Sequence, residues 1–170
     1  MDPTRRLIRF LAVLVSFWCA LIVSAPLGRV FLGDSNAWSA NVYSFFSLIC
    51  HQIDERSFHL LGYKFAVCIR CFSIYAGFLV SLTIQLLRGR VPLRIPNPKF
   101  IIAAVLPMVL DVLLDTLGIK ASTPFSRALT GAIFGAAAPT FILPPLVNAC
   151  RQLQLFPFSQ GALLHAAKTE

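Results

Sequence analysis

Residues 50–77 read CHQIDERSFHLLGYKFAVCIRCFSIYAG, and this stretch joins a cluster of metal-binding side chains to the start of an apolar segment. Its cysteines and histidines are Cys50, His51, His59, Cys68 and Cys71. The C-x-x-C pair places two thiols on one turn, close enough to chelate a metal or to form a disulfide. Of the five cysteines, only Cys19 and Cys150 lie elsewhere in the chain, so the clustering argues for a site.

A metal centre is the first hypothesis for this cluster. Cys50, His51, Cys68 and Cys71 would supply three sulfurs and one nitrogen, a set that suits zinc or an iron–sulfur centre. Cys50 and His51 are adjacent in the sequence. Both can therefore bind one ion only if the backbone turns between them.

Thiol–disulfide exchange is the second hypothesis. Cys68 and Cys71 would be the active pair, with Cys50 as a third thiol that passes electrons on. Arg70 lies between the two active thiols and would favour thiolate. The electron partner would be a quinone or another thiol. The alternative without chemistry is that the cysteines are small buried residues or one static disulfide.

The composition is that of an integral membrane protein, whose main partner is the lipid bilayer. Of 170 residues, 57% are hydrophobic and 13% charged, and the mean hydropathy is +0.75. The net charge of +8 does not indicate nucleic-acid binding, because the basic residues cluster at the ends of apolar runs. The nucleotide-binding and hydrolase motifs GxxxxGK[ST], GxGxxG, HExxH and GxSxG do not occur in the sequence.

Four apolar runs predict an all-α, multi-pass membrane domain over residues 1–147, followed by a cytoplasmic tail over residues 148–170. The predicted spans are residues 7–25, 65–87, 100–117 and 126–147. Residues 42–50 are apolar but too short to span, and they predict an interfacial or re-entrant helix.

Turn residues mark the predicted connections. Residues 26–41 begin with Pro26 and contain two glycines followed by Asp34, Ser35 and Asn36, so they predict a turn region. Residues 53–61 predict an outside turn or a short helix. Pro139, Pro144 and Pro145 are expected to bend or end the last span.

Basic residues orient the predicted spans. With both termini in the cytoplasm, the inside carries Arg5, Arg6, Arg9, Arg88, Arg90, Arg94, Lys99, Arg151 and Lys168. This excess over the outer loops follows the positive-inside rule. It predicts a protein of the cytoplasmic membrane, with the cysteine cluster on the outer face.

Charged side chains in the outer halves of the spans predict a shared polar pocket. Asp111 and Asp115 are four residues apart, so they share one helix face. Charges near hydrocarbon are expected to pair, and Asp115 with Arg127 is the first pair predicted. The members of the predicted pocket are Arg56, Arg70, Asp111, Asp115 and Arg127.

A third hypothesis uses this cluster in a small transporter or a lipid-binding protein. Carboxylates at mid-depth are what proton- or cation-coupled transport needs. Four spans are few for a transporter, so the protein would act as a homo-oligomer. Gly131 and Gly135 form a G-x-x-x-G, which predicts close helix packing within the chain rather than dimerisation.

The motifs together resemble a family of small prokaryotic membrane proteins, domain of unknown function 2085. The run CHQ-x3-RSF, the later C-x2-C-x3-YAGF, a P-x3-D in the third span and R-x2-TG-x3-G in the fourth carry the resemblance. It covers about residues 45–140 and implies a polytopic membrane protein without implying an activity. One departure is Asp115, which stands where the family tends to have glutamine.

Overall fold

The computed structural model describes residues 3–88 and 96–152, and it is mostly helical. Its elements in chain order are α1 (Pro3–Leu32), α2 (Ala37–Ser47), the 3-10 helix η1 (Asp54–Arg56), β1 (Ser57–Leu60), β2 (Tyr63–Cys68), α3 (Ile69–Arg88), α4 (Pro98–Thr116) and α5 (Pro124–Gln152). The predicted tail starts inside α5, and the rest of it lies outside the described residues, as do Arg90 and Arg94.

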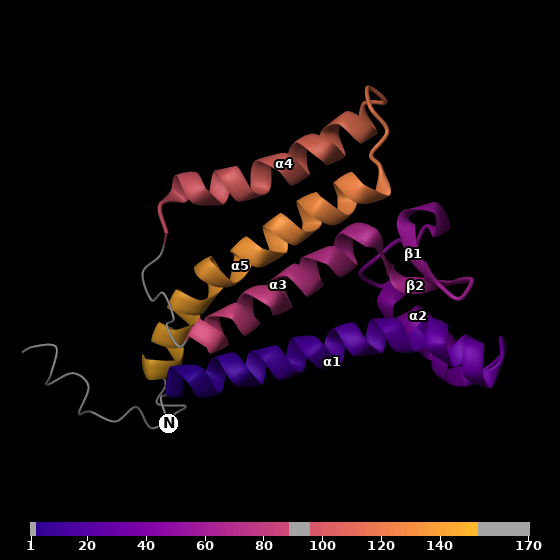
Figure 1. Cartoon of the computed structure of the whole chain (residues 1–170), viewed down its shortest axis with the longest axis horizontal. Coiled ribbons are helices and arrows are strands. Elements are labelled where there is room, and N and C mark those ends of the chain that lie inside the picture. Colours follow the sequence, from indigo (N-terminus) through magenta and orange to yellow (C-terminus); the bar gives the residue numbers. More distant parts are fainter. Residues whose placement is uncertain (1–2, 89–95, 153–170) are drawn as a thin grey trace, which may run out of the picture.

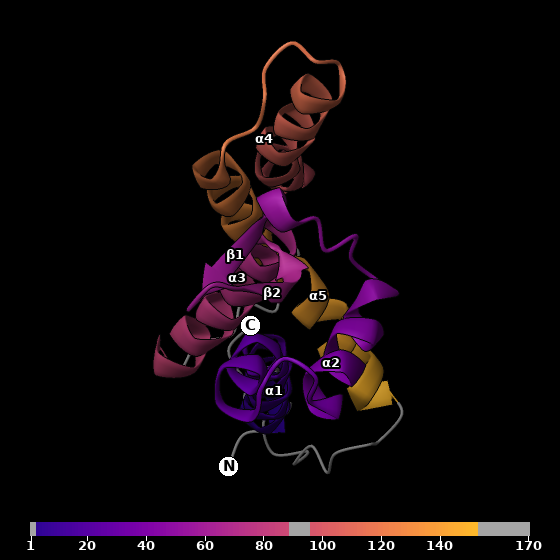
Figure 2. The same ribbon diagram turned by 90° about the vertical axis from the view of Figure 1, so that its right-hand side faces the viewer.

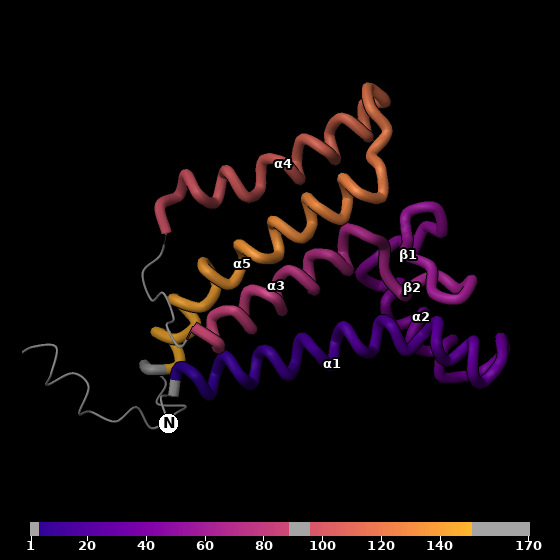
Figure 3. Tube along the Cα trace, in the orientation of Figure 1, coloured from indigo at the N-terminus to yellow at the C-terminus, as the bar shows by residue number. Residues whose placement is uncertain are grey.

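The four long helices lie side by side in the spatial order α1, α3, α5, α4 (Figures 1 and 3). Their directions alternate along the chain, so the neighbours α3 and α5 run parallel to each other and antiparallel to α1 and α4. Helix α2 and the β hairpin gather at the end where α1 stops and α3 starts. The view along the bundle shows α4 standing off from the other helices (Figure 2). In α4 only Ala104 is buried, so this helix is the least enclosed of the four.

Among the described residues, three helices are long and apolar enough to cross a membrane: Thr4–Leu32, Ile69–Arg88 and Pro124–Cys150. The prediction of membrane helices is thus supported, while the count of four is not reached on length and composition alone. Helix α4 has 19 residues, but it carries Lys99, Asp111 and Asp115. Those charges keep it outside the apolar class.

Prolines do not end helices where the sequence predicted that they would. Helix α1 continues through Pro26 to Leu32, so the expected turn region is shorter and α2 starts at Ala37. Helix α5 likewise continues through its three prolines. Packed helices tolerate proline when neighbours satisfy the freed backbone groups. The Ser39 hydroxyl of α2 donates to the Ala25 carbonyl at 2.8 Å, which ties α1 to α2 at this level.

The short helix predicted within residues 53–61 is present as η1, and a two-stranded hairpin follows it and takes up the first residues of the second predicted span. Strands β1 and β2 are antiparallel, and Leu61 and Gly62 connect them with φ angles of 52° and 88°. Two positive φ angles are typical of the tight turns that join hairpin strands. The apolar residues from Phe65 onward run directly into α3, so hydropathy alone placed the helix start too early.

The main core lies beneath the hairpin. Its buried members are Ile22, Ala25, Val42, Tyr43, Phe46, Cys50, Ala66 and Val67. They come from α1, α2, the following loop and β2, so burying them fixes the hairpin on the end of the bundle. Cys50 therefore belongs both to the core and to the predicted site.

Glycines set the distance between α3 and α5. A Cβ atom on Gly135 would lie 2.1 Å from the Ile74 carbonyl oxygen, and one on Gly77 would lie 2.4 Å from the Ala132 carbonyl oxygen. Only a residue without a side chain allows backbones to approach so closely. The within-chain role predicted for the G-x-x-x-G sequence is confirmed.

Replacing Gly135 with alanine is expected to lower the free energy of unfolding by about 3 kcal/mol, because the new methyl group meets backbone that cannot rotate away. Thermal unfolding in detergent, followed by circular dichroism, measures the change. Leu129→Phe adds volume at an exposed position of the same helix and serves as the control. Equal stability of Gly135→Ala and the wild type would contradict the tight α3–α5 contact.

Candidate metal site and its arginine wall

Three thiols meet at the hairpin end of the bundle. Cys50 lies in the loop after α2, Cys68 ends β2, and Cys71 lies in the first turn of α3. Their three sulfur atoms all lie within 4.8 Å of one another. The structure thus brings Cys50 to the C-x-x-C pair, whose first cysteine is 18 positions further along the sequence.

Backbone contacts fix this convergence. The Cys50 N–H donates to the Phe46 carbonyl at 3.0 Å, which anchors Cys50 to the end of α2. The Cys68 N–H donates to the Cys50 sulfur at 3.1 Å. Pairing of Ser57 with Cys68 in the hairpin returns the chain to the same place. Cys68 is thereby held between the loop and the helix.

Gln52 shapes the loop that carries Cys50. Its φ of 49° is in the left-handed region, which is unusual for a residue other than glycine. The side-chain amide of Gln52 donates to the Tyr43 carbonyl at 2.7 Å, and the Lys64 ammonium donates to the backbone carbonyl of Gln52 at 2.9 Å. These two bonds hold the loop against α2 and β2.

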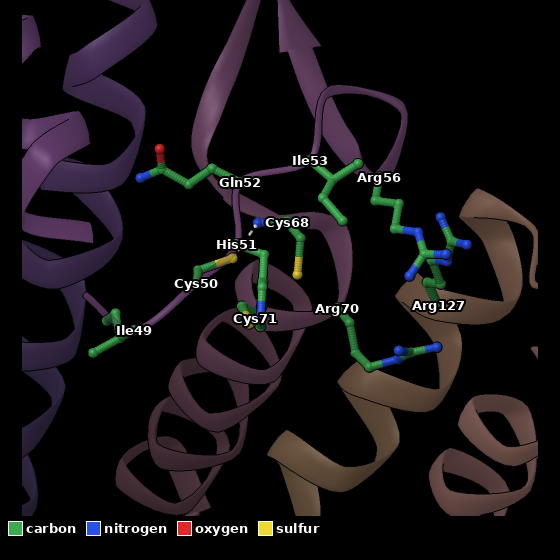
Figure 4. A pocket seen from close by; sticks show the side chains of 10 residues that line it. All are labelled: Ile49, Cys50, His51, Gln52, Ile53, Arg56, Cys68, Arg70, Cys71 and Arg127. Atoms are coloured by element: carbon green, nitrogen blue, oxygen red, sulfur yellow. Dashed lines mark hydrogen bonds between the residues drawn. The ribbon is translucent and has the colours of Figure 1, made fainter. Parts of the chain in front are cut away.

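A cavity of about 290 Å³ opens between the thiols and three arginines. Its lining residues are Ile49, Cys50, His51, Gln52, Ile53, Arg56, Cys68, Arg70, Cys71 and Arg127 (Figure 4). The guanidinium groups of Arg56 and Arg127 lie close together on one side, and the sulfurs lie on the other. The cavity therefore combines soft metal ligands with a cationic wall.

Two aspartates of α4 stand next to the arginines. Arg70 of α3 forms a close ion pair with Asp111. Asp115 lies 3.6 Å from both Arg127 and Arg56. The predicted pairing of Asp115 with Arg127 is confirmed, and these contacts join the end of α4 to α3, α5 and η1.

Ser122 organises the second ion-pair group. Its N–H donates to an oxygen of Asp115 at 3.0 Å, and its hydroxyl accepts a bond of 2.6 Å from Nε of Arg127. Ser122 thereby fixes both partners in the turn between α4 and α5. The sequence analysis did not identify Ser122 as a member of the polar pocket.

Hydrogen bonds to the Cys50 sulfur stabilise its thiolate. The Cys68 thiol, the Cys71 thiol and the backbone N–H groups of Gln52 and Cys68 all lower the pKa of Cys50, against an opposing effect of burial. The pKa therefore lies well below its ordinary value. A thiolate is the form that binds metals and that attacks disulfides.

Comparison with known proteins places these residues inside one region that matches a family. The family described as predicted membrane protein (DUF2085) matches residues 50–141, a range that starts at Cys50 and includes every residue of the predicted site. The chain belongs to this family. Helices α1 and α2 precede the matched region.

Two archaeal proteins are similar to this member of the DUF2085 family. An uncharacterized protein of Methanocaldococcus jannaschii is 39% identical over 142 residues, which cover 79% of this chain and 90% of that protein. An uncharacterized protein of Methanothermobacter thermautotrophicus is 32% identical over 106 residues, covering 60% of this chain and 93% of that protein. No solved structure matches.

His51 does not join the sulfur atoms as the sequence predicted. It lines the same cavity but lies outside the group of mutually close ligand atoms. Cys50 is the one of the two that packs in the core. His59, the spare histidine, instead contacts Asp54 at 3.3 Å.

Metal-free protein at neutral pH is expected to show the ultraviolet absorbance of a thiolate. Folding lowers the pKa of Cys50, so ionisation of this thiol stabilises the folded state. The stabilisation is complete above the ordinary pKa of 9.0, and it is lost as the pH falls through the lowered pKa of the folded state. Cys50→Ser should abolish the absorbance and Cys150→Ser should retain it. Absorbance that appears only near the ordinary pKa would contradict the assignment.

Asp111→Asn is expected to lower the free energy of unfolding by about 3 kcal/mol, because it leaves the enclosed Arg70 charge without its partner. Chemical denaturation in detergent measures the effect. Asp54→Asn, at an exposed ion pair, should change little. The double variant Arg70→Gln/Asp111→Asn should lose less than the sum of the single losses; strict additivity would argue against the pair.

Proposed function

We propose that the protein is a membrane metalloprotein in which Cys50, Cys68 and Cys71 bind one zinc ion. The convergence of three thiols from two separate chain segments carries this proposal. A disulfide needs two cysteines, whereas zinc uses three or four ligands. Tetrahedral zinc at about 2.3 Å from each sulfur needs sulfurs about 3.8 Å apart, so only a small contraction is required.

Zinc fits these residues better than an iron–sulfur cluster does. Clusters of the common kinds use four cysteine ligands. Cys19 lies within α1 and Cys150 near the end of α5, and neither belongs to the group of close sulfurs. A single ion with three sulfur ligands needs no fourth cysteine.

The fourth position on the ion would face the cavity. His51 lines this cavity and would reach the ion only by a change in its loop; otherwise the position stays open to an external ligand. Zinc with three protein ligands and an open position polarises a bound ligand or activates water. The residues thus support a reactive site more than a sealed structural one.

The same proposal places four helices across the membrane, with α4 as the fourth, in the cytoplasmic membrane of a prokaryote. Arg5, Arg6, Arg9, Arg88 and Lys99 all lie at the bundle end opposite the thiols. Ion pairing of both aspartates lowers the cost of placing α4 in the bilayer. Both termini would then be cytoplasmic and the metal site would lie on the outer face.

Thiol–disulfide exchange is the second candidate, and the position of the C-x-x-C pair favours it. Cys68 directly precedes α3 and Cys71 lies in its first turn, so the two thiols stand one turn apart and can form a disulfide. Oxidation of the two thiols would form one S–S bond. Two protons and two electrons would pass to a quinone or to a disulfide, which would be reduced to the quinol or the dithiol.

The transporter hypothesis gains less support. Asp111 and Asp115 are engaged by arginines, and neither lines the cavity. Coupled transport needs a carboxylate that exchanges ions. Oligomerisation, which this hypothesis required, stays a prediction.

Elemental analysis of the full chain, purified in detergent without chelator, tests the metal proposal. We expect near-stoichiometric zinc in the wild type and loss of the metal in Cys50→Ser and in Cys68→Ser/Cys71→Ser. The matched control Cys19→Ser/Cys150→Ser removes two thiols outside the site and should keep the zinc.

A folded wild type without metal would overturn the proposal, as would full metal content in Cys50→Ser. Alkylation under oxidising and reducing conditions then decides the redox candidate. Cys68 and Cys71 that stay free under both conditions would exclude it.

A further inference from the structure

We propose that the three arginines of the cavity bind the phosphate of a membrane lipid, whose chain lies in an apolar groove between α4 and α5. This inference makes the lipid-binding hypothesis specific and does not depend on the metal. Its two observations are a surplus of hydrogen-bond donors in the cavity and an apolar groove beside α5, the helix that also carries Arg127.

The arginine wall holds donors that protein acceptors do not use. Arg56 and Arg127 lie 3.6 Å from Asp115, which is an ion-pair distance but too long for a hydrogen bond. Nε of Arg70 is buried and has no acceptor among the described residues. A buried donor without an acceptor is costly, and an oxyanion in the cavity would satisfy it.

The carboxylates do not fill the place of this oxyanion. Arg56, Arg70 and Arg127 line the cavity, whereas Asp111 and Asp115 do not. The two aspartates offset two of the three arginine charges. The preference of the cavity for one anion over another would therefore depend on the directed N–H groups of three guanidiniums rather than on net charge.

Phosphate is the group that suits this geometry. Planar guanidinium groups bind phosphate oxygens in pairs, and three of them from η1, α3 and α5 approach from different elements. Arg127 is only 8% exposed, so its charge is held in place rather than free at the surface. The cavity of about 290 Å³ also accommodates a group larger than a single phosphate.

The groove between α4 and α5 has room for a hydrocarbon chain. Its volume is about 380 Å³, and its lining residues are Phe100, Ala103, Ala104, Ile133, Ala136, Ala137 and Thr140. The hydroxyl of Thr140 donates to the Ala137 carbonyl at 2.6 Å and presents no unsatisfied donor. Small side chains along both helices leave this space open.

Helix α5 carries both Arg127 of the arginine wall and four residues of the groove, and α4 carries the aspartates that pair with the wall. Ala136 is nine residues beyond Arg127 on α5, or about 14 Å along the axis. Ala104 is seven residues before Asp111 on α4, or about 10 Å. A lipid whose phosphate contacts the arginines would thus lay its chain in the groove, which favours a lipid over free phosphate.

Lipid binding to the delipidated full chain in detergent, followed by native mass spectrometry, tests the inference. The probes are phosphatidic acid, diacylglycerol with the same chains, and inorganic phosphate. We expect phosphatidic acid to bind about tenfold or more tightly than diacylglycerol. Arg56→Gln should remove this preference, because it takes one of the three guanidiniums from the cavity. Arg56 is chosen because it lies on η1, outside the helix bundle. Arg88→Gln, at the other end of α3, should keep it.

A second variant separates the lipid from free phosphate. Ala103→Leu fills the groove from an exposed position, so it should weaken phosphatidic acid but not inorganic phosphate. Val109→Leu, at an exposed position outside the groove, is its control. Equal binding of phosphatidic acid and diacylglycerol, or equal effects of Arg56→Gln and Arg88→Gln, would overturn the inference.

If inorganic phosphate binds as tightly as the lipid and Ala103→Leu has no effect on either, the proposal that a lipid supplies the bound phosphate group is overturned. If Arg56→Gln does not fold, the comparison of the three probes on the wild type still decides. Zinc content measured on the same preparations is independent of these outcomes, so failure here does not imply failure of the metal proposal.

Discussion

The close contact of α3 with α5 is the constraint on which the rest of the structure depends. A Cβ atom added to Gly131 would lie 2.8 Å from the Arg70 carbonyl oxygen. The contact that joins the two helices therefore also sets Arg70 beside α5. Cys71 follows Arg70 and is fixed with it. Arg127 lies one turn before Gly131, which brings it to the same cavity. The glycines thus determine how far the thiols lie from the arginines.

Charge pairing attaches the least enclosed helix. Helix α4 buries a single residue, so apolar packing contributes little to its position. Its aspartates instead contact arginines on α3, α5 and η1. In a bilayer an unpaired charge is costly, so these contacts are strongly favoured once formed. The network that fixes α4 is also the rear support of the arginine wall.

Sequence reasoning found the parts of the site that depend on chemistry and missed those that depend on backbone conformation. The spacing of Cys68 and Cys71 implies proximity, and the cost of charge in hydrocarbon implies the Asp115–Arg127 pair. The hairpin was missed because its second strand is as apolar as the helix that follows. His51, predicted as a fourth ligand, lines the cavity without joining the group of close sulfurs, and the left-handed Gln52 that follows it is a backbone feature that propensity does not indicate.

The order of synthesis gives the ion pairs of α4 a further significance. Arg56 and Arg70 precede α4 in the chain, whereas Ser122 and Arg127 follow it. Asp111 can therefore pair with Arg70 as soon as α4 emerges, but the group around Asp115 is complete only once α5 has followed. We expect the two helices to settle as one antiparallel unit. Charged residues that hold the finished bundle together thus also impose a sequence of assembly on it.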